Sequence, residues 1–400
     1  MASPHAPALR ILFVCLVCIG IGQSMLFSIL PPAARAIGIS PFQVSTIFAT
    51  SASIWVFVSP WWGRRSDVRG RRPIILAGLL GYALSMFSLA VVIEVGLAKR
   101  LPAVLIYPML IVARSLFALL GSGTGPASQA YVADRTSLTE RTAGVALVSA
   151  AMGVGETLGP GVGAALAAVD MLAPLYLAAV LAVISGFMIR RYLPEDGPPL
   201  SHTEPRPPRL SFRDGRVAPF VLVSAALQAV RATTAITLAF FLQDTLHLSP
   251  AQTVQYSGVG FVTMAVAGLL AQLVFVQRLQ PTARQMLHTG VPLTVAAFVI
   301  LTVGGSYPAY LVALFLLGVG LGLTRPGSAA GASLSVGANE QGAVAGLVTG
   351  VAVLGNVIGP MVGTSLYAVR PIGPYVLNTA IMGGAWGLLF ANRRLRNLRS

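Results

Sequence analysis

Four charged residues lie deep inside long apolar runs of this 400-residue chain: Arg114, Glu156, Arg231 and Arg325. An ionisable group inside a lipid bilayer costs roughly 2.5 kcal/mol or more, so each of them is a candidate functional residue. Glu156 is the acid of this set, and we expect it to gain and lose a proton during the working cycle. The alternative is that Glu156 forms a structural ion pair with an arginine.

The excess of arginine over acid among these charges favours a cavity for an anionic or zwitterionic amphiphile, since a cavity for lipophilic cations would hold more acid. Arg231 and Arg325 are the candidate substrate contacts. Gln23 is a candidate cavity amide, because aligning the Ser-Pro pairs described below puts Arg231 beside the position of Gln23. Two other roles remain open: Arg325 can lie at a helix end or the membrane interface, and Arg231 can pair internally.

The residues around Glu156 combine glycine and proline in a pattern that recurs: GETLGPGVG (155–163) is echoed by GNVIGPMVG (355–363). Glycines four residues apart share one helix face, which lets a neighbouring backbone approach closely, and an internal proline kinks the helix. We expect the two faces to meet as a seam between the spans 142–168 and 342–368; generic glycine packing is the alternative. The seam residues are Gly155, Gly159, Pro160, Gly163, Gly355, Gly359, Pro360 and Gly363.

Membrane-spanning helices are the elements that hold these residues. The chain is 55% hydrophobic and only 10% charged, with a mean hydropathy of +0.79, whereas an ordinary soluble domain is about a quarter charged. Apolar runs of about 20 residues, enough to cross roughly 30 Å of hydrocarbon, recur along its length and predict an all-α polytopic membrane protein. Twelve transmembrane helices are expected near 11–31, 42–62, 73–94, 103–126, 142–168, 172–190, 217–241, 252–276, 287–304, 308–330, 342–368 and 374–391.

The charges in the loops predict the orientation. Arginines gather in alternate loops, including 63–73 and 190–216, while the opposite loops hold Arg35, Lys99, Arg100 and Arg370. By the positive-inside rule, both termini are cytoplasmic, in a multi-pass protein of the cytoplasmic (inner) membrane. The same rule accounts for the net charge of +15 without nucleic acid as a partner.

The chain contains two pseudo-symmetric six-helix bundles. GISPFQVS (38–45) is echoed by HLSPAQTV (247–254), and T-G-P (124–126) by T-R-P (324–326). The proline-rich segment 190–216 suits a semi-extended linker between the copies. Parallel repeats of this kind hold a substrate site between the halves, near the midplane of the membrane. We expect an N-terminal bundle over 1–191, a cytoplasmic linker over 192–216 and a C-terminal bundle over 217–400.

The loop after the second span reads GRRSDVRGRRP (63–73). Together with twelve spans and a central linker, its G-x-x-x-D-x-x-G-R-R pattern resembles the loop motif of the major facilitator superfamily. The resemblance implies the major facilitator fold and a loop that latches the two halves in one conformation; a purely topogenic arginine cluster is the alternative. Gly63 and Gly70 would permit a tight turn, and Asp67 would accept from a helix N-terminus or pair with an arginine. The latch residues are Gly63, Asp67, Gly70, Arg71 and Arg72.

Two further motifs are similar to those of the twelve-helix drug:proton antiporters of this superfamily. Arg114, a glycine-rich stretch and AYVAD (130–134) resemble the fourth-helix pattern, with one residue more between Arg114 and Asp134 than in tetracycline-type exporters. GETLGPGVG resembles the fifth-helix signature G-x-x-x-G-P-x-x-G. The resemblance implies that helices 1, 4, 7 and 10 line the cavity and that Arg114 serves proton coupling, for which Glu156 is the candidate carrier.

The predicted function is secondary active export of a small amphiphilic drug or natural product by proton antiport with alternating access. Alternatives with the same fold are a facilitator, a lipid or lysolipid flippase, or an exporter of a carboxylate siderophore. The expected partners are the small-molecule substrate, protons and the lipid bilayer, for a monomeric protein with no cofactor beyond the proton gradient. The sequence holds no nucleophile–base set, nucleotide loop or metal-ligand cluster, so we expect no enzyme; Cys15 and Cys18 fit small packing residues.

Overall fold

The structure is a computed structural model that describes residues 6–135, 141–195, 211, 214–337 and 340–391. In this part of the chain the regular structure is entirely helical, as predicted. The chain divides into two compact units, which are residues 1–203 with 249–258 and residues 204–248 with 259–400.

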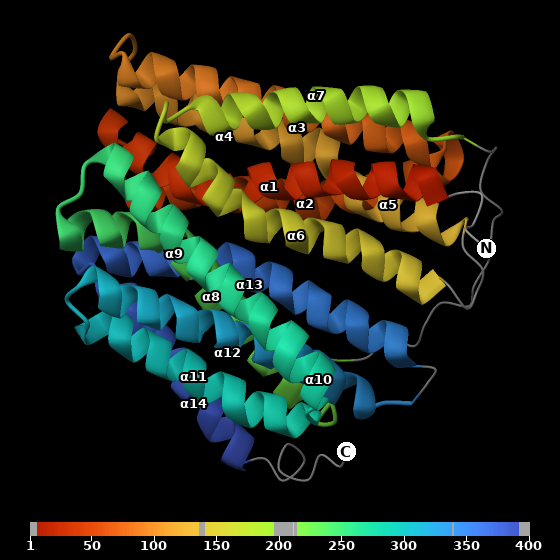
Figure 1. Ribbon diagram of the computed structural model, residues 1–400, viewed down its shortest axis with the longest axis vertical. Coiled ribbons are helices and arrows are strands. Elements are labelled where there is room, and N and C mark those ends of the chain that lie inside the picture. Colours follow the sequence, from red (N-terminus) through yellow and green to blue (C-terminus); the bar gives the residue numbers. More distant parts are fainter. Residues whose placement is uncertain (1–5, 136–140, 196–210, 212–213, 338–339, 392–400) are drawn as a thin grey trace. The chain divides into compact units, whose positions relative to one another are not determined.

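The helices of the first half of the chain, coloured red to yellow-green in Figure 1, belong to the first unit. They are α1 (Ala6–Ile37), α2 (Pro41–Arg69), α3 (Arg71–Leu97), α4 (Ala103–Gly121), α5 (Thr124–Ala133), α6 (Arg141–Ala167) and α7 (Ala173–Tyr192). The fourth predicted span is broken at Ser122 and Gly123, so α4 and α5 together form one span. A Cβ added to Gly123 would lie 2.6 Å from the Cβ of Trp62, so the break fits closely against α2.

The second half of the chain, coloured green to blue in Figure 1, contains α8 (Ala218–Leu246), α9 (Pro250–Leu270), η1 (Ala271–Val276), α10 (Gln277–Leu279), α11 (Ala283–Val303), α12 (Tyr307–Leu334), α13 (Gln341–Val369) and α14 (Gly373–Ala391). The π-helical turn η1 joins α9 to α10 in one span. Counted in this way, the described residues form twelve spanning segments, six in each half. Nine of them combine the length and the hydropathy needed to cross a membrane within the part of the chain that the structure describes.

The echoed Ser-Pro pairs mark the starts of α2 and α9. Ser40 Oγ accepts from the backbone N–H of Gln43 at 3.3 Å, and Gln43 Oε1 accepts from the N–H of Ser40 at 2.9 Å. Ser249 and Gln252 make the same reciprocal pair at 3.3 and 3.0 Å. Each capping box satisfies donors that a helix leaves unpaired at its first turn, and the proline after the serine needs no such partner. The two echoed Ser-Pro sequences therefore form the same capping box at the N-termini of α2 and α9.

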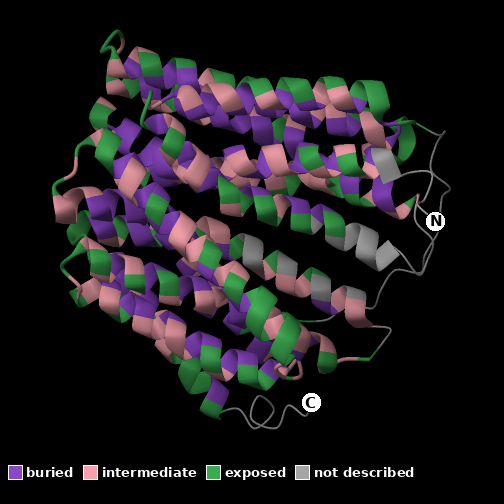
Figure 2. Ribbon diagram, in the orientation of Figure 1, coloured by how far each residue is buried: buried purple, intermediate pink, exposed green. Residues whose placement is uncertain are grey.

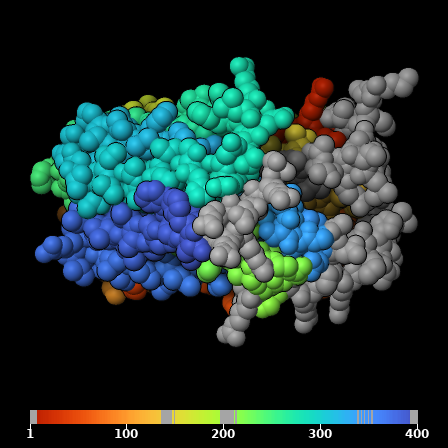
Figure 3. Space-filling model, turned by 90° about the horizontal axis from the view of Figure 1, so that it is seen from below, coloured from red at the N-terminus to blue at the C-terminus, as the bar shows by residue number. Residues whose placement is uncertain are grey.

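The core of each unit lies where helices face their neighbours, as the purple residues in Figure 2 show. In the second unit, Phe241 packs edge-on against Tyr310 and Tyr375, with ring centroids 5.1 and 4.6 Å apart. In the first unit, Tyr82 is fully buried and packs on Phe117 at 4.9 Å. The space-filling view shows the cyan and blue side chains of the second half as a continuous surface, so the gaps between its ribbons are filled (Figure 3).

Candidate functional site

The glycine face of α6 packs against α1 within the first unit. A Cβ added to Gly155 would lie 2.7 Å from the Cα of Gly20, and one added to Gly159 would overlap the carbonyl of Ile21. Ser24 adds a hydrogen bond from its Oγ to the Gly155 carbonyl at 3.4 Å. The two backbones are therefore too close for any larger residue at these positions, as small-x-x-x-small packing requires.

The glycine face of α13 packs against α8 in the same way within the second unit. A Cβ added to Gly355 would lie 3.0 Å from the backbone nitrogen of Ala229, and one added to Gly359 would lie 2.9 Å from the Cα of Ala229. At Gly363 the neighbour is Thr233. Each glycine face therefore packs against the first helix of its own half, and the seam between the spans 142–168 and 342–368 stays a prediction.

These contacts align the two halves residue by residue. Gly155 meets Ile21 where Gly355 meets Ala229, so Ile21 and Ala229 hold equivalent places. Two residues further on, Gln23 on α1 is then equivalent to Arg231 on α8. The Ser-Pro pairs, displaced by one residue more, put Arg231 beside Gln23, and the packing places the two residues at equivalent positions.

Arg114 lies on α4, with only 8% of its surface exposed. Its Nη2 donates to Gln23 Oε1 at 2.9 Å, and the guanidinium carbon lies 5.7 Å from the ring centroids of both Phe48 and Phe117. The Nε and Nη1 groups have no hydrogen-bond partner in the part of the chain that the structure describes. Arg114 is thus a buried cation with donors to spare, held by one amide and two aromatic faces.

Glu156 lies midway along α6, next to the glycine that touches α1. Its side chain is exposed. Among the described residues of the first unit, none forms a hydrogen bond or an ion pair with the carboxylate. A structural ion pair with Arg114, one of the roles open from the sequence, is therefore not present in this conformation.

Arg231 belongs to a polar group that joins α8 to α13. Its Nε donates to Gln228 Oε1 at 3.0 Å and its Nη2 to Asn356 Oδ1 at 3.3 Å, while Gln228 Nε2 donates to the same Asn356 oxygen at 3.5 Å. The arginine is half-buried. Internal bonding of Arg231, one of the open alternatives, is therefore present, and it includes bonds to the neutral amides of Gln228 and Asn356. Asn356 is the residue that replaces Glu156 in the repeat.

Arg325 stands apart from this group. It lies on α12 directly before Pro326, its side chain is exposed, and no hydrogen bond or ion pair joins it to another described residue. The structure therefore does not bring Arg325 into contact with Arg231, and a shared substrate contact stays a prediction.

The turn between α2 and α3 is built on Gly70 and Arg71. Gly70 has φ +93°, a conformation that favours glycine. Arg71 pairs with Asp67, and its Nε donates to Asp134 Oδ2 at 3.1 Å, which ties the turn to the end of α5. Gly63 is not part of the turn: it lies inside α2, because the helix runs on to Arg69. The predicted pairing of Asp67 with an arginine is confirmed.

Arg72 holds the same turn to the end of α7, since its Nη2 donates to the backbone carbonyl of Arg190. Arg71 and Arg72, at the start of α3, thus bind to the ends of α2, α5 and α7. Whether the loop also latches the two halves of the chain stays a prediction.

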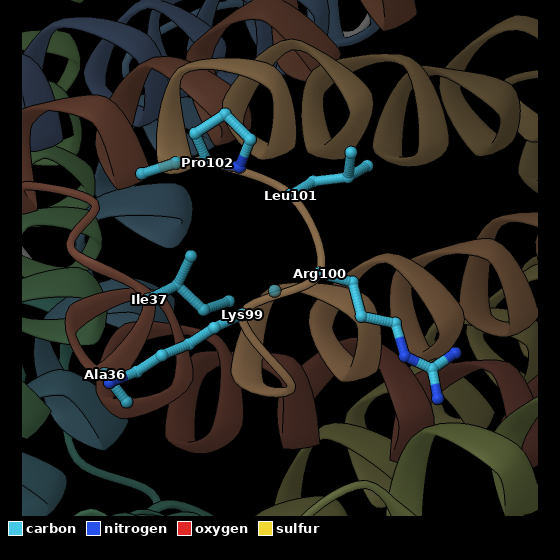
Figure 4. Close-up of a pocket in the computed structure, with 8 residues that line it drawn as sticks. Ala36, Ile37, Lys99, Arg100, Leu101 and Pro102 are labelled. Carbon is cyan, nitrogen blue, oxygen red and sulfur yellow. The ribbon is translucent and has the colours of Figure 1, made fainter.

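A surface hollow of about 370 Å³ lies at the other end of the first unit, where α1 ends and α4 begins. Lys99 and Arg100 line it together with apolar residues. Figure 4 shows the Arg100 guanidinium directed away from the end of Lys99. The two cations therefore do not converge, and the hollow offers no built anion site.

A profile described as Major Facilitator Superfamily matches residues 12–395. The chain belongs to the Major Facilitator Superfamily. It is 24% identical over 399 residues to multidrug resistance protein 1 of Bacillus subtilis (strain 168), with 98% of each chain covered. It is 28% identical over 389 residues to the class C tetracycline resistance protein of Escherichia coli, with 92% of this chain and 91% of that protein covered. The crystal structure of the human organic anion transporter MFSD10 (TETRAN) matches with a TM-score of 0.64 at 21% identity, covering 96% of this chain and 99% of that chain.

Membership of the Major Facilitator Superfamily makes this protein a membrane-spanning transporter of small molecules rather than an enzyme. The predicted family and the predicted all-helical membrane fold are both confirmed.

Two of the candidate residues, Arg231 and Arg114, have partners that the sequence did not predict. Asn356 and Gln228 bind Arg231, and the rings of Phe48 and Phe117 flank Arg114. A partial signal existed for Asn356, since it replaces Glu156 in the repeat. The aromatic residues carried no signal, because phenylalanine is common in every apolar run.

Proposed function

We propose that the protein exports a small amphiphilic molecule by proton antiport, with alternating access from the two sides of the membrane. Two observations support export: the relatives carry the names of multidrug and tetracycline resistance proteins, and they match over more than nine tenths of the chain. The exposure of the Glu156 side chain and its lack of an ion pair among the described residues support the proposal that the transported ion is a proton.

Glu156 is an acid on a spanning helix whose carboxylate is exposed and has no ion pair among the described residues of its unit. A carboxylate committed to a structural pair would hold its charge throughout the cycle. A free carboxylate in a spanning helix changes its charge when its access to water changes, because desolvation disfavours the charged form. Glu156 is therefore suited to carry the coupled proton.

The substrate in this proposal is anionic or zwitterionic. Arg231 and Arg325 are its cationic contacts, and Gln23 adds an amide. Arg231 is half-buried, and its guanidinium donates to the amide oxygens of Gln228 and Asn356.

Transport in proteoliposomes tests the driving ion. Purified protein is reconstituted, tetracycline serves as the zwitterionic probe, and its movement is measured with and without an imposed pH gradient. Antiport predicts accumulation against the tetracycline gradient only when the pH gradient is present. A rate that is independent of the pH gradient, with no accumulation, would show a facilitator instead.

Single substitutions test the charge preference of the substrate site. Arg231→Gln and Arg325→Gln are each expected to slow transport of an anionic probe such as fluorescein at least tenfold, with a smaller effect on cationic ethidium; the figure corresponds to about 1.4 kcal/mol. Arg100→Gln, at an exposed arginine outside the spans, is the matched control. Unchanged anion transport in both variants would contradict the assignment.

A further inference from the structure

The C-terminal part of α2 carries on one face a row of exposed residues with the half-buried Arg65 among them. Trp61, Arg64, Arg65, Val68 and Arg69 line a shallow surface hollow of about 250 Å³. Their spacing of three and four residues places them in one row along the helix. We call this row the α2 stripe.

The arginines of the α2 stripe have no anionic partner in the part of the chain that the structure describes. Arg64, Arg65 and Arg69 form neither an ion pair nor a hydrogen bond with any described residue. By contrast, Arg71 and Arg72 two and three positions further on are both bound. The stripe is thus a concentration of positive charge that no described residue compensates with an ion pair.

The polarity of this face changes along the helix axis. Phe57, one turn before Trp61, is 81% exposed, and Trp61 is 45% exposed with the Arg65 guanidinium 4.9 Å from its ring centroid. At a rise of 1.5 Å per residue, Phe57 lies about 12 Å from Arg65 along the axis. Apolar, indole and guanidinium groups in this order match the acyl, interfacial and phosphate levels of a bilayer.

We propose that the α2 stripe binds the headgroup of an anionic phospholipid. The arginines bind the phosphate oxygens, Trp61 lies at the glycerol level, and Phe57 contacts the acyl chain. Arginine forms bidentate hydrogen bonds to phosphate, which favours this contact over nonspecific attraction to the surface. This inference does not depend on proton antiport.

Native mass spectrometry of the purified full-length protein tests the proposal. Phosphatidylglycerol and phosphatidylcholine with identical acyl chains are added in detergent, and the fraction of protein with bound lipid is measured for each. We expect phosphatidylglycerol to bind more tightly. Loss of each arginine is expected to weaken that preference about fivefold, and loss of all three on the order of a hundredfold, from a contribution of about 1 kcal/mol per arginine near a membrane surface.

The variants are Arg64→Gln, Arg65→Gln and Arg69→Gln, singly and together, so that a triple variant that fails to fold leaves three single measurements. Arg191→Gln removes an exposed arginine at the end of α7, and Arg100→Gln removes one at the opposite end of the unit. Neither control is expected to change the preference. An equal loss in Arg191→Gln would overturn the site in favour of general surface charge, and so would an unchanged preference in the stripe variants. Competition by millimolar glycerol phosphate would show a site for soluble phosphate rather than for lipid.

Discussion

Gly70 and Gly63 show, at the scale of single residues, how two glycines of one motif differ. Gly70 has φ +93° and ψ 160°, a region that side chains disfavour, and a Cβ there would overlap the Glu195 carboxylate. Gly63 has helical neighbours, and no atom lies within 4 Å of the place a Cβ would take. The motif therefore needs glycine at the turn, while the glycine inside α2 is free to change without steric cost.

Gly70→Ala is accordingly expected to lower the stability of the protein by about 1–3 kcal/mol, because the backbone would be held in a region that is nearly exclusive to glycine. Gly63→Ala is expected to be neutral or to stabilise α2 by about 0.5–1 kcal/mol. Thermal unfolding in detergent, followed by the fluorescence of the purified variants, measures both. Equal melting temperatures for the two variants would contradict this distinction.

The candidate charged residues could be identified from the sequence, but their contact partners could not. An arginine or a glutamate in an apolar run is visible without a structure. Gln23 and Arg114 meet at 2.9 Å from helices 91 residues apart in the chain, and no local pattern encodes the rotation of α1 against α4. For the same reason, the sequence left two roles open for Glu156, which are a free acid and a member of a structural ion pair.

The helix pairs α1–α6 and α8–α13 carry the internal repeat at the scale of elements. Each pair is joined by three glycines that leave no room for a Cβ at their closest approaches. Their four-residue spacing was readable from the sequence, and so was the repeat. The identity of the facing helix was not, because a flat face accepts any close backbone. The nearest backbone proved to be that of the first helix of the same half.

Substitutions on α6 test this packing. Gly159→Ala would place a methyl group against the Ile21 carbonyl and the Ser24 hydroxyl, and we expect a loss of about 1–3 kcal/mol from overpacking. Gly153→Ala, on the same helix with open space around it, is expected to be neutral or slightly stabilising. Melting temperatures in detergent compare the two. If Gly159→Ala melts at or above the wild-type temperature, the close contact with α1 is not maintained in the membrane protein.

At the scale of the whole molecule, the chain is two similar units joined by a polar linker. The linker ends in a charged group of the second unit: Arg216 donates to Glu340 at 2.9 and 3.0 Å and to Asp214 at 2.8 Å. This group fixes the start of α8 to the start of α13. Composition and loop charge predicted the membrane fold and the linker, but not this connection, because its two sides are 124 residues apart.

The Arg216–Glu340 pair predicts a pH dependence. The hydrogen bond from Arg216, followed by one from the N–H of Gly337, lowers the pKa of Glu340. A lowered carboxyl pKa contributes stability above the unfolded value of about 4.3, and this contribution is lost as the pH falls through the folded value. Glu340→Gln is therefore expected to melt lower than wild type at pH 7 and to lose less stability between pH 5 and about 3.

Arg216→Gln is the companion variant, and it is expected to reproduce the effect of Glu340→Gln. The double variant is expected to be less destabilised than the sum of the two single changes, because one interaction is lost in all three. Additive losses of stability in the double variant would show that the Arg216–Glu340 pair does not stabilise the second unit. Parallel pH profiles for wild type and Glu340→Gln would show the same.

Proton coupling through Glu156 is the central claim for the whole transporter. The most direct measurement compares wild type and Glu156→Gln in proteoliposomes, recording tetracycline accumulation and the internal pH together, with Glu94→Gln as an exposed acid outside the proposed pathway. Glu156→Gln is expected to lose pH-driven accumulation by at least tenfold, while Glu94→Gln retains it. Wild-type accumulation with an unchanged pH dependence in Glu156→Gln would contradict this claim.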